Sequence, residues 1–139
     1  MFVQWNRTLA IGVPKVDNEH KHLVDVLNAF YRAFQAGVAR EKVFAVLNML
    51  LRYAEIHFRN EEALMEAANY PELQEHRKEH ERLIEEVFDL NARCEVGKTE
   101  ITFETMEFLK HWLLDHILAE DKKLRDYFEQ RGIPPGWES

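Results

Sequence analysis

Apolar residues recur every three or four positions through four long stretches of this chain, and short polar or glycine-containing connections separate the stretches. This period is that of an amphipathic α-helix, because side chains three or four residues apart lie on one face. We therefore predict helices at about residues 18–37, 40–67, 72–94 and 100–129. No stretch shows the strict alternation that is typical of a half-buried β-strand.

Residues near the ends of these stretches suit helix boundaries. Asp17 or Asn18 can cap the first helix, and Thr99 can cap the last. Pro71 suits the first turn of the third helix. Long amphipathic helices with short connections favour an all-α fold, an antiparallel up-down-up-down four-helix bundle. We predict a single domain, 1–139, with an N-terminal arm over about 1–17 and a short C-terminal tail.

The composition narrows the classes of partner. Of the 139 residues, 46% are hydrophobic and 31% are charged, and the formal net charge is −7. An acidic balance argues against nucleic acid and against anionic membrane surfaces. The sequence has neither a signal-peptide pattern at its start nor a stretch apolar enough for membrane insertion. Since Cys94 is the single cysteine, no intramolecular disulfide can form, and we expect a cytoplasmic monomer in which Cys94 has no function.

Seven histidines are present, and five of them fall on apolar stripes near one end of the predicted bundle. Taken singly, each is more often a solvated surface residue than a ligand. Burying them all without a partner, however, would cost several kcal/mol each. That end of the bundle brings together the following residues: His20, His57, Glu61, His76, His80, His116 and Asp121.

Such a set predicts a centre with two metal ions. If both carboxylates bridge two octahedral ions that also share an oxide or hydroxide, one coordination position stays open. Nitrogen and carboxylate ligands without thiolates suit non-haem iron, with manganese or zinc less favoured. An open position beside a redox-active pair is where O₂ can bind.

Five segments carry a resemblance to a known family: a tryptophan near the start, GVPKVDNEHKHL, HFRNEEALM, YPELQEHRKEH and HWLLDHILAED. Together they resemble the hemerythrins, and specifically the single-domain bacteriohemerythrins, over nearly the whole chain. The resemblance implies two iron ions with an oxo or hydroxo bridge and O₂ as a reversible ligand. It implies one iron on His76, His80 and His116, the other on His20 and His57, and Glu61 and Asp121 bridging both.

The segment HILAED raises a question of spacing. Asp121 follows His116 by five positions, whereas Glu120, at four, has the usual helical spacing. The resemblance points to Asp121. Either a π-bulge brings positions i and i+5 to one face, or the metals span the angle between two side chains on different faces.

The family's apolar oxygen pocket also has matches in this chain. These are Leu23, Phe58, Met65, Trp112, Leu113 and Ile117. Ordinary packing explains such a stripe equally well. A dry wall would nevertheless slow the loss of bound oxygen as peroxide.

Four polar residues near the candidate ligands match no ligand position. Glu19 stands where a glutamine often precedes the histidine, and we expect it to be solvated, with little effect on the site. Glu62 is expected to face away from the site, with only a minor chance of a role beside it. His22 and His111 are assigned to the surface or to the surroundings of the ligands.

These observations favour reversible O₂ binding at a non-haem di-iron centre, as a carrier, store or sensor, over an enzyme. A protein that accepts the oxygen is then an expected partner. The alternatives are a di-iron oxidase, a peroxide- or nitric-oxide-handling protein, iron storage or sensing, and a structural bundle with incidental histidines. The Glu-x-x-His motif of ferritin-like di-iron enzymes is absent from the candidate site.

Overall fold

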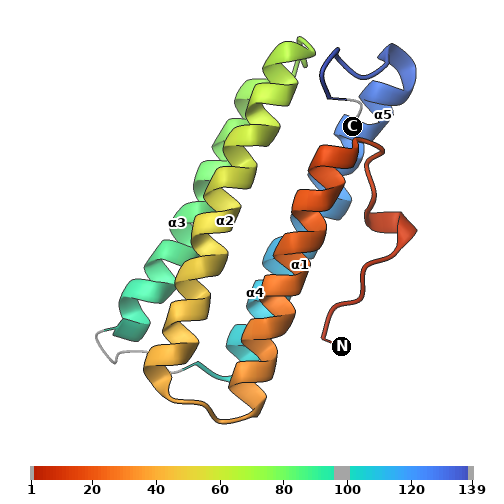
Figure 1. Ribbon diagram of the computed structural model, residues 1–139. Helices are drawn as coiled ribbons and strands as arrows, with labels where there is room; N and C mark the ends of the chain where they lie inside the picture. Colours follow the sequence, from red (N-terminus) through yellow and green to blue (C-terminus); the bar gives the residue numbers. More distant parts are fainter. Residues whose placement is uncertain (1, 96–100, 138–139) are drawn as a thin grey trace.

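The computed structural model describes residues 2–95 and 101–137, and these form an antiparallel bundle of helices with no β-strand among them (Figure 1). The elements are η1 (Arg7–Leu9, a 3₁₀ turn), α1 (Pro14–Gln35), α2 (Arg40–Ala67), α3 (Leu73–Glu95), α4 (Phe103–Asp115), η2 (His116–Asp121, a π-helix) and α5 (Lys122–Arg131). The predicted up-down-up-down bundle is confirmed. Among the described helices, none combines the length and the apolar character needed to cross a membrane.

Helix α1 begins at Pro14, four residues before the predicted start. Proline suits this position because its fixed φ is helical and its missing N–H would have no partner there. Neither Asp17 nor Asn18 caps the helix, so that prediction was wrong. Asp17 instead accepts hydrogen bonds from the backbone N–H groups of Ile11, at 2.8 Å, and Gly12, at 3.2 Å. Its carboxylate thereby fixes the chain that leads into α1.

The other boundaries lie close to the prediction, and α2 matches it. Pro71 precedes α3 and is not part of its first turn. Thr102 caps α4: its side chain accepts from the N–H of Thr105, and the Thr105 hydroxyl accepts from the N–H of Thr102. Thr99, the predicted cap, lies outside the described residues.

The fourth long helix is not continuous. The stretch predicted as one α-helix at about 100–129 is α4, the π-helix η2 and α5 in sequence. The π-helix lies at the depth of the bundle where the candidate ligands gather, so the local change in helical twist concerns the site directly.

Two apolar clusters form the core, and the candidate ligands lie between them. The larger runs along the bundle and includes Leu27, Leu50 and Leu109, each fully buried. The smaller joins the N-terminal arm, α2 and α5 through residues such as Val13 and Leu124. A fully buried side chain of this size contributes about 1.5–3 kcal/mol relative to an exposed one. The site is therefore enclosed by packed apolar layers on both sides along the bundle axis.

The N-terminal segment runs antiparallel along the outside of α1 (Figure 1). The buried side chain of Asn28 holds it there, accepting from the backbone N–H of Val3 and donating to its carbonyl, both at 2.8 Å. This double contact explains how the arm covers α1.

Candidate metal centre

All seven predicted ligands lie in one buried cluster. Each has at most 4% of its surface exposed. α1 supplies one histidine, α2 one histidine and one glutamate, α3 two histidines, and η2 the remaining histidine and aspartate. The cluster is thus built from all four walls of the bundle.

Glu61 lies at the centre, and its two oxygens face different histidines. The Oε1 atom lies 2.8, 3.1 and 3.7 Å from the Nε2 atoms of His76, His80 and His116. The Oε2 atom lies 3.1 and 3.5 Å from those of His57 and His20. One carboxylate therefore divides the histidines into a group of three and a group of two.

Asp121 divides three of these histidines in the same way. Its Oδ1 atom lies 3.3 Å from Nε2 of His76 and 3.4 Å from Nε2 of His116, whereas Oδ2 lies 2.9 Å from Nε2 of His20. Each of the two carboxylates thus presents one oxygen to each histidine group. This is the arrangement expected of carboxylates that bridge two ions.

The π-helix explains the spacing of five. One residue more than in an α-helical turn lies between positions that share a face, so His116 and Asp121 both point into the cluster. Of the two explanations left open by the sequence, the π-bulge is therefore the one that the backbone adopts. Asp121 is fully buried, and the side chain of Glu120 lies outside what the structure describes.

The charges of the cluster are strongly coupled. Burial lowers the pKa of His20 and of His76, but the adjacent Asp121 and Glu61 outweigh it and raise both pKa values to about 10. Burial raises the pKa of Glu61, yet the surrounding histidines, His116 first, hold it well below its usual range. In the metal-free chain, protons on the histidines thus supply the positive charge that two buried carboxylates require.

The residues present fit bound cations. Several inward-facing atoms are buried without a hydrogen-bond partner among the described residues: Nε2 of His20, His57 and His116, Oε2 of Glu61, and both oxygens of Asp121. Ion-pair contacts such as that of His20 with Asp121, at 2.9 Å, join several of these atoms, but none of these contacts has the geometry of a hydrogen bond. Two groups of potential ligand atoms, each within 4.8 Å, share Glu61: Glu61, His76, His80 and His116, and His20, His57, Glu61 and Asp121. Their nitrogen and oxygen atoms suit iron better than thiolate-preferring ions.

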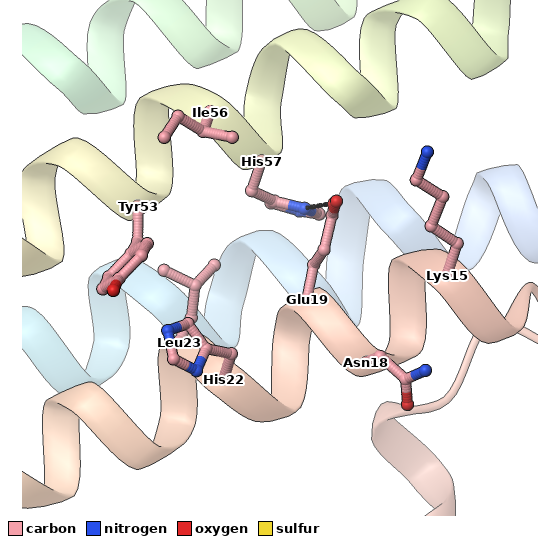
Figure 2. Close-up of a pocket in the computed structure, with 8 residues that line it drawn as sticks. All are labelled: Lys15, Asn18, Glu19, His22, Leu23, Tyr53, Ile56 and His57. Atoms are coloured by element: carbon pink, nitrogen blue, oxygen red, sulfur yellow. Dashed lines mark hydrogen bonds and ion pairs between the residues drawn. The ribbon is translucent and has the colours of Figure 1, made fainter.

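Two carboxylates outside the ligand set contradict the sequence-based expectation. Glu19 is not simply solvated: its Oε1 accepts from Nδ1 of His57 at 2.7 Å (Figure 2). Glu62 does not face away: it is buried, and its Oε2 accepts from Nδ1 of His80 at 2.7 Å. Each directly adjoins a ligand in the sequence. A step of one residue turns a side chain by about 100°, which here points it at a histidine of the neighbouring helix.

Comparison with known proteins identifies the family. A family model described as the Hemerythrin HHE cation binding domain matches residues 11–128. The chain belongs to the hemerythrin family. The bacteriohemerythrin of Stenotrophomonas maltophilia is 33% identical over 122 residues, which span 88% of this chain and 78% of that protein. The bacteriohemerythrin of Clostridium acetobutylicum is 28% identical over 130 residues, which span 91% of this chain and 100% of that protein.

A solved hemerythrin has the same fold. The crystal structure of wild-type hemerythrin aligns with a TM-score of 0.81 and 26% sequence identity, over 91% of this chain and 97% of that chain. Family membership, the fold and the buried His/Glu/Asp cluster agree with one another. Together they make this chain a hemerythrin-family protein with a buried cluster inside the bundle that could hold metal ions.

The apolar residues that match the hemerythrin oxygen pocket are all buried, but they do not form one wall. Five belong to the larger cluster: Leu23, Phe58, Trp112, Leu113 and Ile117. Met65 packs in the smaller cluster, with Leu64 and Leu124. The ring of Phe58 stacks on His80, with centroids 4.1 Å apart, and lies 5.2 Å from that of His116. Through Phe58, the larger cluster therefore contacts two of the candidate ligands directly.

The two histidines assigned outside the ligand set stay outside the cluster. His22 is exposed and lies edge-on to Tyr53, with centroids 4.4 Å apart. His111 is exposed between Glu107 and Asp115, each at 3.8 Å. His22 nevertheless lines the same pocket as Glu19 and His57 (Figure 2).

Proposed function

We propose that this hemerythrin-family chain binds O₂ reversibly at a centre of two non-haem iron ions, as a carrier, store or sensor. The ligands are His76, His80 and His116 for one ion, His20 and His57 for the other, and Glu61 and Asp121 for both. The observation that carries the proposal is the matching division of the histidines by Glu61 and Asp121. When bound, an iron pair supplies redox-active ions that can give electrons to O₂ and take them back.

The two histidine groups differ in size, and this difference indicates which ion has a free position for O₂. Three imidazoles converge on one side of the bridging carboxylates and two on the other. The smaller group provides one ligand fewer, so we assign the O₂ position to the side of His20 and His57. His57 also lines a solvent-open pocket between α1 and α2, next to Glu19 (Figure 2).

The side chains around the centre favour binding over oxidation of a substrate. Five neutral imidazoles and two carboxylates give less negative charge than the glutamate-rich sites of ferritin-like di-iron enzymes. Less negative charge stabilises highly oxidised ions less well. The buried side chains of Phe58 and Trp112 limit the access of water to the ligands, which slows irreversible side reactions.

The test begins with metal-free protein loaded with ferrous iron in the absence of air. We expect two irons per chain and an absorption band in the visible region that develops with O₂ and fades when O₂ is withdrawn. An oxidase would instead pass to the ferric form without recovery. A structural bundle would hold no stoichiometric iron and develop no colour.

A further inference from the structure

One histidine in each half of the centre is held from outside by a carboxylate that is not a ligand. The Nδ1–H of His57 donates to Glu19, and the Nδ1–H of His80 donates to Glu62, each at 2.7 Å. In both rings Nε2 is the atom that faces the bridging Glu61, at 3.1 Å. Each carboxylate therefore fixes one ring in the orientation and tautomer that a metal on Nε2 requires.

The surroundings of these two carboxylates differ. Glu62 is 6% exposed, and its carboxylate also contacts two guanidinium groups, Arg59 at 3.2 Å and Arg77 at 3.5 Å. The side chain of Glu19 is 23% exposed. Its second oxygen accepts from the neutral side-chain amide of Asn60 at 2.7 Å. The negative charge of Glu62 is thus shared with two cations, whereas the charge of Glu19 is directed at His57.

Glu19 is also the carboxylate within reach of solvent. It lines an open pocket of about 360 Å³ between α1 and α2, together with Lys15, Asn18 and Tyr53 (Figure 2). In Figure 2 the carboxylate of Glu19 points toward the His57 ring. The carboxylate that holds His57, in the half with two histidines, therefore reaches the surface. The carboxylate that holds His80, in the other half, is buried.

We propose that Glu19 and Glu62 are positioning residues, each setting the metal affinity of its own half of the centre, and that Glu19 has the larger effect on reduction potential. A carboxylate on the outer nitrogen makes an imidazole a stronger ligand and favours the more positive metal ion. Two guanidinium groups offset that effect at Glu62. The inference rests on the proposed centre of two metal ions.

The first experiment measures metal affinity without using O₂. Metal-free full-length chain is titrated with cobalt(II), and its two binding steps are assigned with His57→Ala and His80→Ala, which each remove one half. We expect Glu19→Ala to weaken the His57 step by about 10–100-fold and to leave the other step unchanged. Glu62→Ala should weaken only the His80 step. The proposal would be overturned if both variants weakened the same cobalt-binding step, or if neither variant weakened any step.

The second experiment separates charge from structural support. Glu19→Gln keeps an oxygen that can accept from Nδ1–H but removes the charge, as Glu62→Gln does for His80. In iron-loaded protein we expect Glu19→Gln to raise the reduction potential clearly more than Glu62→Gln. The exposed Glu129, which lies near Arg125 on α5, provides the control Glu129→Gln, with an unchanged potential. Equal potentials for the two test variants would contradict the asymmetry.

These measurements keep the two proposals apart. If the unmodified chain binds two metal ions but never binds O₂ reversibly, the proposed function fails while the cobalt steps still test Glu19 and Glu62. If an alanine variant does not fold, as judged by its circular dichroism, the glutamine variants still test the proposal, because their reduction potentials are either clearly different, as proposed, or equal.

Discussion

His116 and Asp121 meet in the candidate metal centre, with Nε2 and Oδ1 3.4 Å apart, although five positions separate them in the sequence. In a regular α-helix a step of five residues turns a side chain by about 140° from its starting direction. The π-helix η2 removes that offset. A backbone irregularity that leaves no residue-type signature therefore decides which carboxylate enters the centre.

This relationship predicts that Asp121 is essential for holding two ions. Asp121→Ala removes the oxygens that face His20 on one side and His76 on the other. We expect the iron content to fall clearly below two per chain, as measured by metal analysis of loaded protein. Asp115→Ala is the matched control, because Asp115 is an exposed aspartate six residues earlier in the sequence. Full iron content in Asp121→Ala would show that the Asp121 carboxylate is not needed to hold two ions.

His57 in α2 is buried and His111 in α4 is exposed, so their replacement should affect O₂ binding differently. His57 is 2% exposed and faces Glu61, whereas the His111 side chain is 65% exposed. We expect His57→Ala to abolish reversible O₂ binding and His111→Ala to retain it, as followed by the visible absorption under cycles of O₂ and argon. Comparable losses in both variants would argue against the assigned ligand set.

The stability of the metal-free chain should depend on pH in a defined window. The pKa values of His20 and His76 rise from 6.5 to about 10, because the carboxylates of Asp121 and Glu61 outweigh the opposing effect of burial. A raised folded-state pKa gives stability that is fully present below 6.5 and lost as pH rises through 10. The pKa values of Glu61 and Asp121 are lowered, so their contribution is present above their ordinary values and lost in acid.

We therefore expect urea unfolding of metal-free protein to show greatest stability between about pH 4.5 and 6.5, with a fall from there toward pH 10. His20→Gln should remove part of the alkaline fall, because it removes one of the three histidines of the cluster whose pKa is raised, the others being His57 and His76. Stability that stays constant from pH 6.5 to 10 would show that these histidines are neutral in the folded metal-free chain.

Leu23 borders the solvent-open pocket beside the candidate ligand His57. It is 1% exposed, lines that pocket and packs in the larger core cluster. Leu23→Ala should lower the free energy of unfolding by about 2–5 kcal/mol. It should also admit water beside His57, so that iron-loaded protein oxidises irreversibly in air faster than the unmodified chain. Leu47→Ala, in the same cluster but away from this pocket, is the control, with a similar loss of stability and an unchanged oxidation rate.

Periodicity was sufficient to predict the bundle because the apolar stripes alone determine which faces pack. It located α2 to the residue, and it placed the seven ligands at one end of the molecule. The start of α1 was misplaced because Asp17 turns back to the N–H of Ile11 and leaves the first helical position to Pro14. The break in the last helix was foreseen only as one of two options, since helical pattern does not distinguish a π turn from a continuous α-helix.

The supporting carboxylates were beyond the reach of periodicity for a different reason. Glu19 and Glu62 lie one position from a ligand, on the border between the apolar and the polar face of their helices. Whether such a side chain reaches solvent or a neighbouring histidine depends on how closely the next helix approaches. That distance is a property of packing between helices, which a single sequence does not specify.

The most direct test of reversible O₂ binding at this centre is to measure how much O₂ the protein takes up and how much it returns. Anaerobic protein with two ferrous ions per chain is exposed to a measured amount of O₂, then evacuated, over repeated cycles with the gas followed by an oxygen electrode. We predict the uptake of one O₂ for every two irons and its return as O₂ in each cycle. Uptake without return, or uptake that falls to nothing after the first exposure, would contradict reversible oxygen binding at this centre.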